Sequence, residues 1–116
     1  MVKILYAEDS VSIARHVMQT FLKDKFEVVL SPDGEEAFTE FEKSKFDLVL
    51  TDLMMPKLDG VELITKIREI DEKIPIICIT GAKDSIVDKA MAAGANYKII
   101  KPHDFILLPN LINKFY

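Results

Sequence analysis

The sequence predicts a doubly wound α/β fold, in which helices cover both faces of a five-stranded parallel sheet. Two observations carry this prediction. Five short apolar segments alternate along the chain with helical patterns, and two or three of these segments are continuous hydrophobic runs. Such runs are typical of parallel strands buried on both faces, since neither side of the strand meets water.

The predicted strands are short apolar runs, each followed by polar residues or glycine. They are VKILYA at 2–7, FEVVL at 26–30, FDLVLT at 46–51, IPIICIT at 74–80 and YKII at 97–100. Runs of this length between turn-forming residues indicate strands rather than helices.

The first predicted helix follows Ser10, a residue type whose hydroxyl caps helix N-termini. The apolar residues of this segment recur three and four positions apart and should therefore share one buried face. That face comprises Val11, Ala14, Val17, Met18, Phe21 and Leu22.

The same periodicity predicts three further helices, and a fifth is less regular. The second runs from about 34 to 43 and buries Ala37, Phe38 and Phe41. The third runs from about 60 to 70 and buries Val61, Ile64 and Ile67. The fourth runs from about 84 to 93, ends at Gly94, and buries Ile86, Val87, Ala90 and Met91. Because Pro109 suits a first turn, PNLINKFY should form a short final helix after an irregular FILL segment.

Length and composition fit a single globular domain spanning residues 1–116. The net charge of −4 offers no basic surface for nucleic acid or an anionic membrane. The apolar run at the N-terminus is too short for a signal peptide or a membrane span. Cys78, the only cysteine in the sequence, cannot form an internal disulfide. We therefore expect a cytoplasmic protein that binds neither DNA nor membranes directly.

Polar residues gather where the predicted strands end. Glu8 and Asp9 follow the first strand, and Asp52 follows the apolar run of the third. Thr80 ends the fourth strand, and Lys101 follows the fifth. Because doubly wound sheets bind ligands beyond the carboxyl ends of their strands, these five side chains should converge on one edge. Taken alone, Asp52 would more simply begin a turn or cap the next helix.

Three carboxylates at one edge require a cation, because their mutual repulsion otherwise raises the pKa of at least one of them. Oxygen ligands without a nearby histidine or cysteine favour Mg²⁺ over zinc. With the ion held by Asp9 and Asp52, and by Glu8 through water, one Asp52 oxygen stays free to attack phosphorus. Thr80 and Lys101 would balance the phosphoryl oxygens, as phosphoryl transfer requires. The pattern thus predicts phosphorylation of Asp52.

Four motifs in this order resemble the receiver domain of response regulators. They are AED at the first strand end, TDLMMPKLDG around Asp52, ITG at Thr80 and KP at Lys101. Each motif is weak alone, but four at successive strand ends form a specific signal over nearly the whole chain. The resemblance implies a flavodoxin-like sheet with strand order 2-1-3-4-5, as in chemotaxis regulators.

By the same resemblance, Asp52 accepts a phosphoryl group from a sensor histidine kinase or a phosphotransfer protein. The implied Mg²⁺ ligands are Glu8, Asp9, Asp52 and the backbone carbonyl of Met54. Thr80 is the implied switch hydroxyl, Lys101 pairs with the phosphoryl group, and a cis peptide precedes Pro102. The output surface lies around the fourth helix and fifth strand. Such a chain is a phosphoacceptor rather than an enzyme.

The sequence departs from the family pattern near the fifth strand. Receivers carry a switching aromatic three residues before the lysine, but Lys98 occupies that position here, with Tyr97 beside it. Because side chains of a strand alternate between faces, Tyr97 cannot replace it without a slip in register. Either Lys98 acts as a polar switch, or the partner protein does not recognise the residue at this position.

Two positions that could orient a water for phosphate loss carry neither an acid nor an amide. They are Met54, two residues after Asp52, and Ala82, two residues after Thr80. We therefore expect an aspartyl phosphate that hydrolyses slowly.

Three other functions fit parts of the pattern. A hydrolase of the haloacid dehalogenase type also uses a strand-end aspartate with Mg²⁺, but it carries D-x-D where this chain has Met54 as the third residue. A flavodoxin-like or dinucleotide-binding module of the same fold would need phosphate-binding glycines, and no G-x-G-x-x-G follows the first strand. A receiver-shaped binding module that does not signal by phosphorylation is the remaining alternative, favoured only by Lys98.

No linker or effector domain follows Tyr116 in this sequence. We therefore expect either a stand-alone regulator that acts on a downstream protein, or a receiver whose effector domain is missing.

Overall fold

The computed structural model has the predicted doubly wound sheet, and it describes residues 1–81 and 84–116. Ala82, one of the two positions expected to bear on phosphate loss, lies outside the described residues. The five strands are all parallel and lie in the order β2-β1-β3-β4-β5, as the family resemblance implied. They are β1 (Lys3–Ala7), β2 (Glu27–Ser31), β3 (Leu48–Asp52), β4 (Ile76–Thr80) and β5 (Tyr97–Ile100).

The register of the sheet brings the carboxyl ends of the strands level. Ala7 pairs with Ser31 on one side and Thr51 on the other. Thr80 pairs with Ile100 on the far side of β4. Residues that follow these strands are therefore neighbours at one edge of the sheet.

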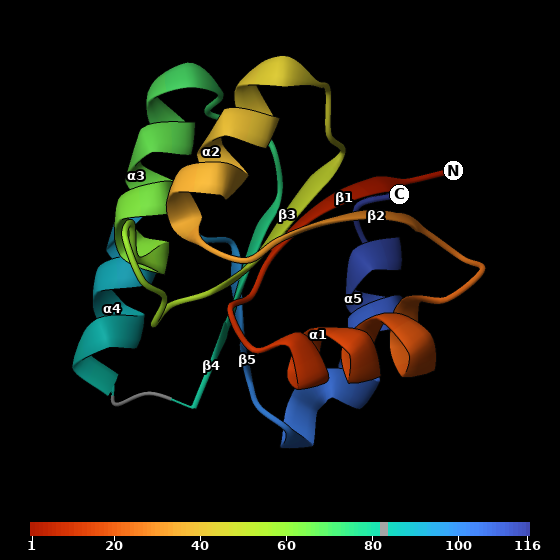
Figure 1. Ribbon diagram of the computed structural model, residues 1–116. Helices are drawn as coiled ribbons and strands as arrows, with labels where there is room; N and C mark the ends of the chain where they lie inside the picture. The colour runs from red at the N-terminus through yellow and green to blue at the C-terminus, as the bar shows by residue number, and fades with distance from the viewer. Residues whose placement is uncertain (82–83) are drawn as a thin grey trace.

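Helices cover both faces of the sheet (Figure 1). One face is covered by α2 (Gly34–Lys43), α3 (Gly60–Ile70) and α4 (Asp84–Ala93), whose predicted bounds are confirmed. The other face is covered by α1 (Val11–Val17) and α5 (Leu108–Asn113). Successive strand residues point into these two cores in turn: Leu5, Val49 and Cys78 face the first, whereas Ile4, Leu50 and Ile77 face the second.

The N-terminal helix differs from a regular α-helix in its second half. The Ser10 hydroxyl caps α1 as predicted, accepting a hydrogen bond from the Ile13 amide at 3.4 Å. After Val17 the chain continues as a π-helix, η1 (Met18–Leu22). Near the C-terminus, a 3-10 helix, η2 (His103–Leu107), occupies most of the segment expected to be irregular, and Pro109 lies in the first turn of α5.

Two residues predicted to be buried are exposed. Val11 is 63% exposed because it lies beside Leu30 of the edge strand β2, beyond which no further strand covers it. Met91 is also exposed. Val87 and Ala90 make the buried contacts of α4, and Met91 lies at the margin of that face, about 40° from Val87 and about 100° from Ala90 around the helix.

The remaining predicted core residues are at least partly covered. Ala37, Ile64 and Ile67 are buried, and a further group is partly buried against the same core: Phe38, Phe41, Val61 and Ile86. Within the described part of the chain, no helix combines the length and the apolar character needed to cross a membrane.

Candidate functional site

The five predicted site residues lie at the carboxyl edge of the sheet. Glu8, Asp52 and Thr80 are almost fully buried, whereas Asp9 is exposed and Lys101 is partly buried. Parallel pairing explains the clustering of the acids, because β1 and β3 are adjacent and end at the same level. Oxygens of Glu8, Asp9 and Asp52 all lie within 4.8 Å of one another.

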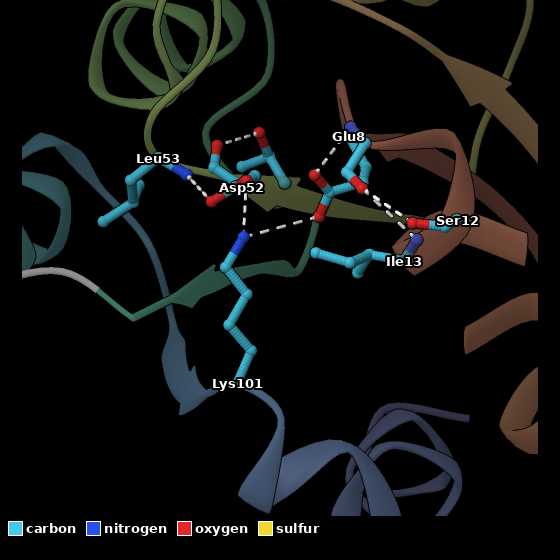
Figure 2. Close-up of polar contacts among 8 residues, drawn as sticks. Glu8, Ser12, Ile13, Asp52, Leu53 and Lys101 are labelled. Atoms are coloured by element: carbon cyan, nitrogen blue, oxygen red, sulfur yellow. Dashed lines mark hydrogen bonds and ion pairs between the residues drawn. The ribbon is translucent and has the colours of Figure 1, made fainter. Parts of the chain in front are cut away.

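Lys101 reaches into this cluster from the end of β5 (Figure 2). Its Nζ lies 2.8 Å from Asp52 Oδ2 and 3.7 Å from Glu8 Oε1. Burial lowers the pKa of the Lys101 ammonium, but the hydrogen bond to Asp52 and the nearby carboxylates outweigh this effect and raise the pKa overall. The peptide bond between Lys101 and Pro102 is cis, as the resemblance implied.

Both carboxylate oxygens of Asp52 accept hydrogen bonds. Oδ1 accepts from the Leu53 amide at 2.8 Å, and Oδ2 accepts from Lys101 Nζ at 2.8 Å (Figure 2). The expectation that one oxygen is free is therefore not met in this structure. The Leu53 amide is fixed in the backbone next to Asp52, whereas the Lys101 side chain is 23% exposed and has room to move. Oδ2 is consequently the oxygen that can be released.

Glu8 is a buried carboxylate of the site whose pKa is clearly raised. Burial and the neighbouring Asp52 carboxylate raise the pKa of Glu8 from 4.5 to about 7, although the Ser10 amide and Lys101 oppose this shift. Glu8 Oε2 accepts a hydrogen bond from the Ser10 amide at 3.1 Å. Glu8 Oε1 is buried and accepts no hydrogen bond from any described residue. An ionised Glu8 therefore needs a further cation.

The site residues fit a hard divalent cation. Among residues 1–81 and 84–116, three carboxylates face one ammonium group, so a net negative charge remains to be neutralised. All the side-chain donors are oxygens, and one of them, Glu8 Oε1, is a buried acceptor without a hydrogen bond from the described residues. Mg²⁺ prefers this donor set. The loop after Asp52 carries Met54, whose side chain is exposed.

The fourth and fifth strands join at the site through their backbones. The Lys101 amide donates a hydrogen bond to the Thr80 carbonyl at 3.1 Å, which ties the position of the lysine to that of the threonine. Cys78 lies two residues before Thr80 and is fully buried, and burial raises the pKa of its thiol to about 11. The thiol therefore stays protonated at neutral pH.

The residue at the usual aromatic position points to solvent. Lys98 is exposed on the edge strand β5, and Tyr97 is also partly accessible. The Tyr97 ring packs edge-on against Phe115 with ring centroids 5.8 Å apart, and Lys114 Nζ lies 5.7 Å from its centroid. Tyr97 is thus engaged with the C-terminal segment, away from the acidic cluster.

Sequence reasoning missed two contributions to the site, both from backbone amides. The Ser10 amide holds Glu8 Oε2, and the Leu53 amide holds Asp52 Oδ1. Backbone amides carry no residue-type signature, so no pattern in the sequence points to them.

Comparison with known proteins places this chain in a family. The response regulator receiver domain family matches residues 4–113. The chain belongs to this family. Its members are signal receivers of two-component systems, and this assignment agrees with the observed strand order. The match favours a receiver over the hydrolase and dinucleotide-binding alternatives.

Several curated relatives of this receiver are transcriptional regulatory proteins. It is 41% identical over 106 residues to the transcriptional regulatory protein YcbL of Bacillus subtilis, covering 90% of this chain and 46% of that protein. It is 36% identical over 102 residues to the alkaline phosphatase synthesis transcriptional regulatory protein PhoP of the same species, covering 86% and 42%, respectively. The receiver therefore spans less than half the length of these relatives.

Solved receivers have the same architecture over the whole chain. The chemotaxis response regulator CheY4 of Vibrio cholerae superposes with a TM-score of 0.88 at 28% identity, covering 100% of this chain and 99% of that one. The response regulator TrrA of Thermotoga maritima, solved in complex with Mg²⁺ and BeF, has a TM-score of 0.89 at 27% identity, with 100% of both chains covered.

Proposed function

We propose that this receiver signals by Mg²⁺-dependent phosphorylation of Asp52, with a sensor histidine kinase or a phosphotransfer protein as the donor. One observation carries the proposal: Asp52 is a buried carboxylate that contacts Lys101 at 2.8 Å and shares an oxygen cluster with Glu8 and Asp9. A buried acid with a cation on one side and further acids on the other is suited to phosphoryl transfer. The receiver acts as a phosphoacceptor and not as an enzyme on other substrates.

In the proposed reaction, Asp52 Oδ2 attacks the phosphorus of a phosphohistidine. An O–P bond forms while the N–P bond breaks, and the donor imidazole keeps the electron pair of that bond. Lys101 moves from Oδ2 to one phosphoryl oxygen, and the Thr80 hydroxyl donates a hydrogen bond to another. Mg²⁺, held by Glu8, Asp9, Asp52 and the Met54 carbonyl, would supply the remaining positive charge.

Output is proposed to run through the surface around α4 and β5. Movement of Thr80 toward the phosphoryl group would shift the segment that follows it, and a downstream protein or effector domain would bind one of the two states. The transcriptional regulators among the relatives support an effector of that kind. Lys98 lies exposed on this surface, where it serves as a polar switch or is not read by the partner.

The phosphoryl group is proposed to leave slowly. The exposed Met54 side chain has no acid or amide with which to orient a water for attack on phosphorus. Loss of the phosphoryl group within seconds from the purified receiver in Mg²⁺ would contradict this part of the proposal.

Intact-mass spectrometry tests the central step. The wild type should gain one phosphoryl group on incubation with a small-molecule phosphodonor and Mg²⁺. Asp52→Asn and a metal-free wild-type sample should gain none. Asp59→Asn is the matched control, because Asp59 lies in the following loop and asparagine also caps helices. The absence of a gain in every sample would leave the non-phosphorylated binding module as the function.

A further inference from the structure

The loop between β3 and α3 is pressed against the first residue of α2. A Cβ atom added to Gly34 would lie 1.9 Å from the Leu58 carbonyl oxygen and 2.7 Å from its carbonyl carbon. Both are backbone atoms, so no side-chain rotation could relieve the overlap. Leu58 belongs to the loop that leaves Asp52, which makes this a contact between the start of α2 and the phosphoacceptor loop.

The conformation of Gly34 does not itself require glycine. Among the described residues, Gly94 is the glycine with a positive φ. Asp33 already caps α2 by accepting a hydrogen bond from the Glu36 amide at 2.8 Å. Alanine is favoured over glycine in helices, by up to roughly 1 kcal/mol. Glycine is therefore needed at position 34 because the Leu58 backbone lies too close for a Cβ atom.

The loop itself contains a strained turn that its surroundings must hold. Lys57 has a φ of 69°, and the Leu58 amide donates a hydrogen bond to the Pro56 carbonyl at 2.9 Å across it. Such a conformation is costly for a residue with a side chain and persists only where neighbouring structure fixes it.

The backbone approach of Gly34 to Leu58 is a stronger restraint than the ion pair between the loop and Asp33, the N-cap of α2. The ion pair from Lys57 to Asp33 measures 3.8 Å, and the Lys57 side chain is 63% exposed. The Asp33 side chain is 11% exposed, but a pair with one partner this exposed and at this distance contributes little to stability. Besides the packing of the Met55 and Leu58 side chains on the core, the approach of Gly34 to the Leu58 carbonyl is therefore a backbone restraint on the loop.

Both ends of the loop are fixed as well. At the β3 end, the Gly60 amide donates a hydrogen bond to the Leu53 carbonyl at 2.9 Å. At the α3 end, Asp59 and Glu62 form a reciprocal capping box. Because the ends are held, a push on Leu58 must be absorbed between them, in the segment that includes Met54.

We propose that Gly34 is a positioning residue for the Mg²⁺ site, acting through Leu58 on the path of the loop and hence on the Met54 carbonyl. This inference rests on the proposed function, because it takes that carbonyl to be a ligand of the ion. Gly34 itself contacts neither the ion nor the phosphoryl group.

Isothermal titration of Mg²⁺ into the full chain tests the inference. Gly34→Ala should weaken Mg²⁺ binding by about tenfold, the usual scale for residues that orient metal ligands. Amide chemical shifts of the loop from Met54 to Leu58 should change in the same variant without Mg²⁺. Thr39→Ala, an exposed change in the same helix, should alter neither quantity.

The outcomes separate the two proposals. Wild-type affinity with unchanged loop shifts in Gly34→Ala would overturn the positioning role. Failure of the wild type to bind Mg²⁺ would instead overturn the proposed function. If Gly34→Ala loses its helical circular dichroism, Leu58→Gly replaces it as the test. Glycine at the residue that Gly34 approaches loosens this part of the loop and adds no atom to α2, so it should weaken Mg²⁺ binding severalfold; an unchanged affinity would count against the role.

Discussion

The Lys101 ammonium lies 2.8 Å from Asp52 Oδ2, although 49 residues separate the two in sequence. The same nitrogen lies 3.7 Å from Glu8 Oε1. In the absence of a metal ion, this lysine is thus the cation of the described residues that balances two buried carboxylates. Its contribution to stability should therefore depend on whether Mg²⁺ is present.

Replacing Lys101 with methionine should destabilise the metal-free receiver more than the Mg²⁺-bound one. Without the ammonium, the buried Asp52 and Glu8 carboxylates lose their partner, a loss that costs roughly 1–3 kcal/mol of unfolding free energy. Bound Mg²⁺ would supply the missing charge and reduce the difference. Urea unfolding with and without Mg²⁺ measures both values.

Lys98→Met is the matched control for this experiment, because Lys98 is an exposed lysine in β5, the strand that Lys101 follows. It should change the unfolding free energy by less than about 0.5 kcal/mol in either condition. Equal losses in Lys101→Met with and without Mg²⁺ would show that the ion and the ammonium do not balance the same carboxylates.

Mg²⁺ affinity should fall as the pH is lowered from 8 to 6. The pKa of Glu8 in the metal-free fold is about 7, so a proton competes with the ion below that value. Once the pH is well below the pKa, apparent affinity falls about tenfold for each pH unit. Calorimetric titrations at several pH values measure this slope, and Glu8→Gln should remove it. Equal affinities at pH 6 and 8 in the wild type would contradict the assignment.

The same raised pKa makes the stability of the metal-free receiver depend on pH. Below pH 4.5, Glu8 is protonated in both the folded and the unfolded chain. Between pH 4.5 and about 7, the folded chain retains a proton that the unfolded chain has lost. The contribution of Glu8 to the unfolding free energy therefore declines as the pH rises through this window.

The fold could be predicted from the sequence because its signals are local. Apolar runs of strand length indicated the strands. Helical periodicity located α2 (34–43), α3 (60–70) and α4 (84–93) at their observed bounds. The acids at the strand ends were equally visible, since parallel strands must end together. Glu8, Asp9 and Asp52 accordingly form the cluster that the pattern predicts.

What the sequence could not predict depends on contacts between distant segments. The exposure of Val11 follows from its place beside an edge strand, which helical periodicity cannot reveal. The π-helical turn from Met18 to Leu22 leaves the apolar spacing almost unchanged. Gly34 approaches Leu58, which lies 24 positions later in the sequence (58 minus 34). Neither the residues around Gly34 nor those around Leu58 show a pattern that predicts this contact.

Two tyrosines provide a paired test of buried polar groups. The Tyr6 hydroxyl is buried without a hydrogen-bond partner among the described residues, whereas the Tyr116 hydroxyl donates to the Asp47 carbonyl. Tyr6→Phe should therefore leave the unfolding free energy unchanged or raise it by up to about 1 kcal/mol, while Tyr116→Phe should lower it by about 1 kcal/mol. Urea unfolding of both variants measures the contrast. A larger loss in Tyr6→Phe would mean that its hydroxyl is hydrogen-bonded in solution.

Gly94→Ala should destabilise the receiver by roughly 1–3 kcal/mol. Gly94 has a φ of 126°, and an added Cβ would lie 2.7 Å from Arg68 Cγ. The Arg68 guanidinium donates hydrogen bonds to the Gly94 carbonyl at 3.0 and 2.8 Å and to Asn96 Oδ1 at 3.0 Å. Any shift of Arg68 would therefore disturb the link between α3 and the start of β5.

Gly81→Ala is the matched control in the same urea measurement. A Cβ at Gly81 would meet Lys101 Cγ at 3.9 Å, an ordinary contact, so a change below about 0.5 kcal/mol is expected. Similar losses in the two variants would show that neither the backbone conformation nor the contact with Arg68 distinguishes Gly94.

The single buried thiol gives this receiver a built-in probe of its own opening. Cys78 lies in β4 between β3 and β5, and both its burial and its raised pKa protect it from alkylating reagents while the sheet is intact. Modification by a maleimide must wait until β4 becomes accessible. The labelling rate therefore measures how often the central strands separate. This rate can be compared before and after phosphorylation without an engineered label.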